Sequence, residues 1–131
     1  RPLVYEDGNQ TRDFISIHDV VEASMLAIER SEGDCQVFNV GQGVPIKVSD
    51  VARIIAKIFR SDIEPEISNT FRKGDVRHCY ADITRIREVL GFKPKVSFED
   101  GMRELVEWAH GAESVDLFDR ARRELKERGL A

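Results

Sequence analysis

The first segment of the chain alternates apolar with polar residues, a pattern typical of short strands. Residues 3–17 predict a strand, a turn and a second strand, and the turn falls at residues 6–9, where aspartate, glycine and asparagine cluster. The period of two is clearest over residues 13–17. Further short strands are expected at residues 36–40, before a glycine-rich turn, and at residues 64–67.

Helical periodicity separates these strands. A first helix is expected from near Asp19 to Gly33, with either Ser16 or the pair His18 and Asp19 as its cap. A second helix is expected from Ser49, a residue type that favours the N-cap position. Both carry apolar residues at helical spacing: Val20, Val21, Ala23, Leu26, Ala27 and Ile28 in the first, and Val48, Val51, Ala52, Ile55, Ile58 and Phe59 in the second.

Three more helical segments are expected after a polar, irregular stretch at residues 68–76. The first is short, with Asp82 as its cap and Gly91 as the glycine that ends it. The second begins at Ser97, and Asp100 three positions later completes a capping-box pattern. The third runs to the C-terminal end. About five helices with short strands predict a mixed α/β (α+β) fold class.

Composition and charge narrow the class of protein. At 131 residues, with 41% hydrophobic and 34% charged residues, the chain resembles one globular domain. No apolar run approaches the ~18 residues that a membrane helix needs, and a net charge of −4 argues against a nucleic-acid partner. Cys35 and Cys79 stand far apart, so free thiols in a reducing, cytoplasmic compartment are expected, with a disulfide as the open alternative.

Sequence patterns for catalysis, metal binding or cofactor binding are missing. His18, His78 and His110 are scattered, and each is expected to be a surface or capping residue. The turn at residues 41–43 lacks the third glycine of a dinucleotide fingerprint, and Pro45 follows where a helix N-terminus should hold the pyrophosphate. We therefore predict no catalytic, cofactor-binding or metal-binding residue in this chain.

Three arginines lie beside predicted turns, at Arg12, Arg72 and Arg77. A guanidinium suits a diphosphate because it offers paired donors to two oxygens and stays charged when partly buried. Asp75, close to Arg72, can accept hydrogen bonds from the hydroxyls of a ribose. The alternative is that Arg72 and Asp75 form an ordinary surface ion pair.

Five blocks of sequence, in order, resemble the substrate-domain signature of the extended short-chain dehydrogenases/reductases, a family that includes NAD-dependent nucleotide-sugar epimerases and dehydratases. The blocks are residues 4–15, 18–23, 37–43, 72–77 with 80–82, and 90–94. They lie within residues 3–108, so only the last helix falls outside the resemblance. The resemblance implies the C-terminal, substrate-binding part of a Rossmann-type fold.

In full-length members of that family, an N-terminal Rossmann domain binds NAD(P) and holds the catalytic Ser/Thr, Tyr and Lys. The C-terminal part binds the nucleoside diphosphate-sugar. The resemblance therefore implies that residues 1–131 are this C-terminal part, and that residues 19–43 complete a Rossmann domain absent from the chain. It also implies NAD as cofactor of the full-length enzyme, a UDP- or dTDP-sugar as its partner, and a homodimer.

The resemblance also assigns roles by position. Arg12 and Arg72 look like the pyrophosphate ligands, and Asp75 resembles the acid that contacts ribose. Gln10 lies in the same loop as Arg12 and completes the predicted site. Tyr5 resembles the aromatic residue placed against the nucleobase; the alternative is a half-buried strand tyrosine that serves packing.

The finer assignment rests on less sequence. Residues 77–82 and the tail at 119–130 resemble a branch of dTDP-L-rhamnose 4-epimerases. The alternatives are a 4,6-dehydratase, a reductase or a decarboxylase of the same family, or a non-catalytic sugar-nucleotide-binding module.

If the Rossmann strands are absent, the helix and the strand within residues 19–40 lose their packing partners. On the order of several hundred Å² of contiguous apolar surface is then expected around Val20, Leu26 and Phe38. The strand at residues 36–40 is expected to be an exposed edge. Burial of all these residues within the chain would instead indicate a closed monomeric domain.

The chain by itself is predicted to show no epimerase activity and no measurable NAD binding. It contains no Tyr-x-x-x-Lys motif, because Tyr5 and Tyr80 are followed four positions later by Asn9 and Thr84. The measurement is turnover of nucleotide sugars by the purified chain with added NAD, together with calorimetry for NAD. Turnover of any nucleotide sugar would contradict the prediction.

Overall fold

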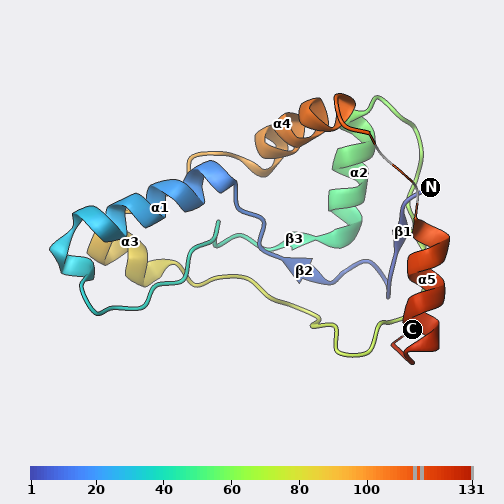
Figure 1. The fold of residues 1–131 in the computed structure, drawn as a ribbon, viewed down its shortest axis with the longest axis horizontal. Helices are drawn as coiled ribbons and strands as arrows, with labels where there is room; N and C mark the ends of the chain where they lie inside the picture. The colour runs from blue at the N-terminus through green and yellow to red at the C-terminus, as the bar shows by residue number, and fades with distance from the viewer. Residues whose placement is uncertain (114, 116, 131) are drawn as a thin grey trace.

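The computed structural model describes residues 1–113, 115 and 117–130 as an elongated set of helices and very short strands (Figure 1). The helices are α1 (Ile17–Glu29), α2 (Val48–Ile58), α3 (Thr84–Leu90), α4 (Phe98–His110) and α5 (Phe118–Glu127). A short 3₁₀ helix, η1 (Ser31–Gly33), follows α1. The strands are β1 (Leu3–Val4), β2 (Thr11–Arg12), β3 (Ile46–Lys47) and β4 (Glu66–Ile67). These elements confirm the predicted mixed α/β class.

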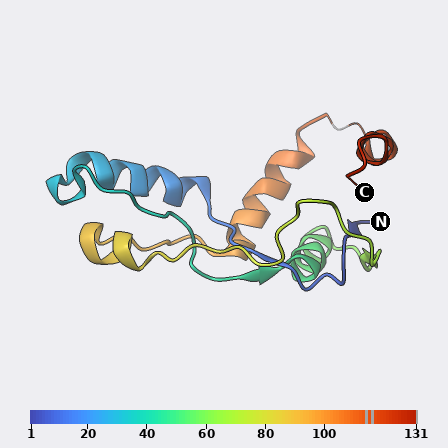
Figure 2. The same ribbon diagram turned by 90° about the horizontal axis from the view of Figure 1, so that it is seen from below.

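The elements gather at two ends of the molecule. Figures 1 and 2 show α1 and α3 side by side at one end, and α2, α4 and α5 toward the other. Strand β1 pairs in parallel with β4, and β2 pairs antiparallel with β3. Each strand is two residues long, so the strands fix where loops begin and end and do not build a sheet core. None of the described helices is long and apolar enough to cross a membrane.

The best-packed core lies between α1 and α3. Its buried members are Ala23, Ile86, Leu90 and Phe92. Half-buried apolar residues pack around them: Ile15, Leu26, Phe38, Ile83 and Val89. The core is small because each helix contributes a single apolar stripe, and burial of these side chains is the main force that holds this end together.

Asp13 ties three segments together just after β2. Its carboxylate accepts hydrogen bonds from the backbone N–H groups of Gln42 (2.8 Å), Gly43 (3.0 Å) and Ala81 (3.1 Å). Gly41 is buried against this carboxylate, and a Cβ at Gly41 would lie 2.5 Å from Asp13 Oδ2. The glycine is therefore required by the close approach of the turn to Asp13.

A second carboxylate, Asp19, performs a similar role at the start of α1. Asp19 is 2% exposed, and its two oxygens accept hydrogen bonds from the backbone N–H groups of Lys95 (3.0 Å) and Val96 (3.1 Å). A buried carboxylate is tolerated only where such donors replace water. Asp19 thereby joins α1 to the segment that leads into α4.

Three of the predicted helix ends are confirmed. Ser16 caps α1, Ser97 caps α4 by accepting the Asp100 N–H bond (3.1 Å), and Gly91 ends α3 in the left-handed conformation at φ 65°. Three other predictions are wrong. Helix α1 ends at Glu29, before Gly33, and the N-cap of α3 is Ile83, not Asp82. The N-cap of α2 is Lys47. Ser49 is buried in the first turn of α2.

Two predicted strands are not strands in the described chain. The strand predicted at residues 13–17 is absent: residues 13–16 connect β2 to α1. The Asp13 side chain there bonds to the Gln42 N–H. Residues 36–40 have no partner strand among the described residues. A strand needs a neighbour for its backbone hydrogen bonds. Here the Val37 carbonyl oxygen accepts a bond from Arg85 Nη1 (3.2 Å).

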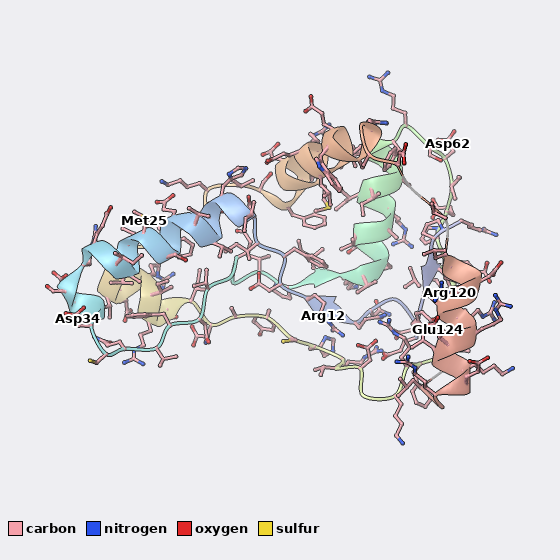
Figure 3. All side chains as sticks on the ribbon, in the orientation of Figure 1. Arg12, Met25, Asp34, Asp62, Arg120 and Glu124 are labelled. Carbon is pink, nitrogen blue, oxygen red and sulfur yellow. The ribbon has the colours of Figure 1, made fainter. Side chains whose placement is uncertain are left out.

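The outer face of α1 is an exposed apolar stripe. Its residues recur three or four positions apart and are each at least 46% exposed: Ile17, Val21, Met25 and Ile28. Figure 3 shows Met25 on the side of α1 away from α3. The predicted centre of this surface is wrong, because Val20, Leu26 and Phe38 are half-buried, and Leu26 and Phe38 pack on the core.

Substitution of Gly41 by alanine is expected to destabilise the fold. The added Cβ would lie 2.5 Å from Asp13 Oδ2 and 2.6 Å from Ala81 Cβ, so backbone or side chains must shift. A loss of about 1–3 kcal/mol in the free energy of unfolding is expected, measured by urea denaturation. The matched control is Gly101→Ala in α4, where the nearest atom is 3.8 Å from the added Cβ. This control is expected to gain about 0.5–1 kcal/mol, and equal effects of the two changes would contradict the role of Gly41.

Asp82 is expected to contribute a pH-dependent part of stability. Its carboxylate accepts the Thr84 N–H bond (2.9 Å) at the start of α3, which lowers the pKa of Asp82 below its ordinary value. This stability is present above the unfolded pKa of about 3.9 and is lost as the pH falls toward the folded value. Asp82→Asn keeps a capping acceptor but does not titrate. The free energy of unfolding is expected to fall less between about pH 5 and about pH 3 in this variant. Identical slopes would contradict the prediction.

Candidate functional site

Two loops that are far apart in the sequence run side by side and form the candidate site. Glu6 N–H donates to the Thr70 carbonyl oxygen (2.7 Å), and Thr11 N–H donates to that of Arg77 (3.0 Å). Cys79 N–H returns a bond to the Thr11 carbonyl oxygen (3.1 Å). These backbone bonds place residues 5–12 against residues 70–79. They explain how a predicted irregular stretch still has a defined position.

Two of the predicted substrate-binding residues, Arg12 and Arg72, contact a third, Asp75. Arg12 Nη2 lies 3.1 Å from Asp75 Oδ1, and Arg72 Nη2 lies 3.1 Å from Asp75 Oδ2. One carboxylate therefore bridges two guanidinium groups. Figure 3 shows Arg12 on β2, where the strand leads into the centre of the molecule. The side chains of Arg12 and Asp75 are 28% and 26% exposed, so the pair is accessible without being fully in water.

Tyr5 joins this cluster through its ring. The Arg72 guanidinium carbon lies 4.9 Å from the centre of the Tyr5 ring, a cation–π arrangement. Tyr5 directly follows β1, outside the strand, and is half-buried. The ring face near the site is therefore in contact with Arg72.

Gln10 lies beneath the loop and is 5% exposed. Its Nε2 donates to the Tyr5 carbonyl oxygen (2.8 Å), which fixes the shape of the loop that carries Tyr5. Its Oε1 is buried and has no hydrogen-bond partner among the described residues. A buried acceptor of this kind needs a donor, supplied by a water or a ligand.

Arg77 closes the first loop onto the second, although the predicted substrate-binding set leaves it out. Its guanidinium donates to both carboxylate oxygens of Asp7 (2.9 and 2.7 Å) and to Glu6 (2.6 Å). The hydrogen bonds from Arg77, followed by the one from the Asn9 N–H, lower the pKa of Asp7 well below its ordinary value. The bonds to Asp7 and Glu6 raise the pKa of Arg77. The sequence signal for this clamp was an arginine beside a turn and two adjacent acids in the other loop.

A hollow of about 570 Å³ opens between the two loops. Its charged lining balances three basic residues, Arg72, Lys73 and Arg77, with three acidic residues, Glu6, Asp7 and Asp75. A more apolar hollow of about 350 Å³ lies between the start of α1 and α4, with Phe14, Phe98 and Trp108 in its wall. We place the candidate site at the first hollow, because Arg72 and Asp75 line it, whereas the lining of the second contains no arginine or lysine. Arg12 pairs with Asp75 but is not part of this lining.

Of the histidines, His18 lies away from this site and His78 lies between its two loops. His18 pairs with Glu104 (2.8 Å), and His78 contacts the Thr11 hydroxyl (2.9 Å). Within residues 1–113, 115 and 117–130, no three His, Cys, Asp or Glu side chains gather in a way that could hold a metal ion. The structure thus brings together Tyr5, Arg12, Arg72 and Asp75, and sets Gln10 beneath them.

Comparison with known proteins assigns the chain to a family. A family model described as GDP-mannose 4,6 dehydratase matches residues 1–105. The dTDP-L-rhamnose 4-epimerase of Burkholderia thailandensis is 42% identical over 105 residues, which cover 80% of this chain and 29% of that protein.

Solved structures show the same relationship. A UDP-glucose 4-epimerase from Thermotoga maritima with UDP-glucose is 38% identical, with a TM-score of 0.77, over 85% of this chain and 35% of its own. MoeE5, solved with UDP-glucuronic acid and NAD, is 32% identical, with a TM-score of 0.72, over 82% of this chain and 36% of its own. The chain thus spans about a third of the length of these relatives. It belongs to the extended short-chain dehydrogenases/reductases, in the family described as GDP-mannose 4,6 dehydratase.

Proposed function

We propose that this chain is the nucleotide-sugar-binding part of an NAD-dependent nucleoside-diphosphate-sugar 4-epimerase. Arg12 and Arg72 anchor the diphosphate of the substrate. The observation that carries the proposal is the convergence of these two guanidinium groups on one carboxylate, Asp75, which lies 63 positions after Arg12. Both guanidinium groups therefore already bind one anionic group, the Asp75 carboxylate, at the proposed diphosphate position.

The arginines suit this role for a physical reason. Each guanidinium presents its N–H donors in a planar fork, which matches two oxygens of a phosphate and stays charged at any physiological pH. The position of the Arg12 guanidinium is fixed by a hydrogen bond from its Nη1 to the Thr11 carbonyl oxygen (2.8 Å). The diphosphate of the substrate does not react, but its binding to the arginines would fix the position of the sugar relative to the catalytic groups.

The other residues supply the remaining parts of a nucleotide site. Asp75 is proposed to accept hydrogen bonds from the pentose hydroxyls, and Tyr5 to lie against the nucleobase. Gln10 supports the loop through its bond to the Tyr5 carbonyl oxygen. The proposal draws support from the solved relatives, since their structures contain UDP-glucose or UDP-glucuronic acid.

NAD would be held by residues outside this chain. The turn at residues 41–43 leads through Pro45 into β3, not into the N-terminus of a helix, so it does not fit a dinucleotide pyrophosphate. NAD is present with the nucleotide sugar in the MoeE5 structure, and NAD chemistry is proposed for the longer protein on that basis. The residues described here bind and orient the nucleotide.

The exposed apolar stripe of α1 also supports the proposal that a separate NAD-binding part packs against this chain. Ile17, Val21, Met25 and Ile28 form a solvent-facing apolar line that a stable protein normally buries. We propose that residues 19–43 complete the NAD-binding domain of a longer polypeptide, because the relatives are about three times as long as this chain. A cytoplasmic homodimer is the proposed state of that longer protein.

The proposed substrate is a dTDP- or UDP-sugar. The 42% identity to a dTDP-L-rhamnose 4-epimerase favours dTDP-L-rhamnose and epimerisation at C4. A 4,6-dehydratase is the second candidate, because the matching family model carries that description. The nucleotide anchor is the same in both.

Replacement of Arg72 by alanine is expected to weaken binding of UDP or dTDP. The expected loss is about 1.5–3 kcal/mol, the usual worth of a charge-assisted hydrogen bond, measured by calorimetry. Arg72→Lys should restore only part of the affinity, because the lysine ammonium lacks the planar fork.

The matched control for this prediction is Arg53→Ala. Arg53 is an exposed arginine in α2 that pairs with Asp50 and Glu64, away from the candidate site. Its removal should leave nucleotide affinity unchanged. Unchanged affinity in Arg72→Ala would instead make Arg72 an ordinary surface residue and contradict the proposed anchor.

A further inference from the structure

The proposed diphosphate anchor is already paired within the protein. Asp75 bonds to Arg12 through Oδ1 and to Arg72 through Oδ2, each at 3.1 Å. Arg72 also lies over the Tyr5 ring. Asp75 thus contacts both arginines proposed to hold the diphosphate, and Arg72 also covers the ring proposed to hold the base, so Asp75 stands where an anion would bind.

A diphosphate must compete with this internal anion. If Asp75 stayed between the arginines, its negative charge would lie next to the phosphate charges and oppose their binding. If Asp75 moved away, it would lose two charged hydrogen bonds that the exposed part of the site replaces only with water. A bare anion offers Asp75 no new donor in either case.

A nucleotide differs from a bare anion in one respect. Its pentose carries hydroxyl groups, which donate hydrogen bonds to a carboxylate. The ligand then replaces the bonds that Asp75 gives up while its phosphates take over Arg12 and Arg72. The exchange is balanced only when phosphate and pentose are joined in one molecule.

The local backbone allows this exchange on the Asp75 side. Asp75 ends a tight turn in which its N–H donates to the Arg72 carbonyl oxygen (3.1 Å). Gly74 has φ 87° and no atom within 4 Å of its would-be Cβ, so the turn is unobstructed. Arg12, by contrast, lies on β2 and is fixed by its bond to Thr11.

We propose that Asp75 is a specificity-determining residue that makes the site select a pentose-linked diphosphate over free diphosphate. Asp75 pairs with both Arg12 and Arg72, and it releases both only to a ligand that supplies hydroxyl donors in exchange. The inference rests on the proposed function, since it takes the two arginines as the diphosphate anchor. It adds rejection of small anions, such as free diphosphate, to the role of Asp75.

The release of Arg72 also frees the Tyr5 ring. When the guanidinium turns toward a phosphate, the ring face that it covered becomes available to a nucleobase. Binding of the phosphate, the pentose and the base are thereby coupled through one pair of side chains, Arg72 and Asp75.

The test compares UDP with inorganic pyrophosphate by calorimetry on the wild-type chain and on Asp75→Asn. The wild type should prefer UDP. In Asp75→Asn the arginines lose their internal anion, so pyrophosphate should bind more tightly, by on the order of tenfold, while UDP gains less or loses affinity. A variant that merely disturbs the fold would weaken both ligands together, so a gain for pyrophosphate separates the two explanations.

The matched control is Asp50→Asn. It removes the same charge and, like Asp75→Asn, takes an ion-pair partner from an arginine three positions away, but this arginine is Arg53 of α2, away from the candidate site. This control should leave the ratio of UDP to pyrophosphate affinity unchanged. An equal fall of the ratio in both variants would show a general charge effect and overturn the inference.

A second measurement uses only the wild-type chain and so does not depend on the folding of a variant. The ligand 2′,3′-dideoxyuridine diphosphate keeps the base and the phosphates but lacks the pentose hydroxyls. It should bind no more tightly than pyrophosphate. If it binds as tightly as UDP, or if the Asp75→Asn ratio equals that of the wild type, the inference is wrong while the diphosphate anchor stands. If UDP itself does not bind to the wild type, the proposed function is wrong.

Discussion

The structure depends above all on the carboxylate of Asp13. Three backbone N–H groups, from Gln42, Gly43 and Ala81, converge on its two oxygens. These donors belong to the turn before β3 and to the segment that leaves the candidate site. Because the strands are only two residues long, few ladder hydrogen bonds hold these segments. One side chain therefore supplies cross-connections that a larger sheet would provide through its backbone.

The position of the candidate site follows from this connection. Arg12 immediately precedes Asp13, and the Ala81 N–H lies a few residues after Arg72, Asp75 and Arg77. The carboxylate of Asp13 thus holds both loops at one end, and the Arg77 clamp on Glu6 and Asp7 holds them at the other. Between these two points, the side chains of Arg12 and Arg72 both contact Asp75. The two ion pairs of Asp75 hold the three side chains together, and an anion that binds the proposed site would have to compete with them.

The local chemistry of single residues was readable from the sequence. Helix caps are an example, because capping depends on a side chain and the few residues next to it. As expected, Ser16 and Ser97 cap the starts of α1 and α4, and Gly91 ends α3. The mixed α/β class followed from the same local patterns. The predicted site residues were also partly visible, since arginines beside turns and a nearby acid have a recognisable chemistry. The sequence shows Arg77 as an arginine beside a turn but does not indicate its partners, because Glu6 and Asp7 lie about seventy positions away.

Only the tertiary structure decided where partners meet. Residues 36–40 have the composition of a strand, but a strand exists only where a second backbone receives its hydrogen bonds, and the described chain offers none. In the same way, the apolar residues of α1 predict a helix by their spacing. Which of them face α3 was set by the positions of Ile86 and Leu90. The sequence by itself determined the helices, their caps and the charged residues of the loops, because these arise from neighbours along the chain. The pairing of Arg12 with Asp75, the burial of Gln10 and the exposure of Ile17, Val21, Met25 and Ile28 arise from contacts between distant segments, and the fold alone determined them.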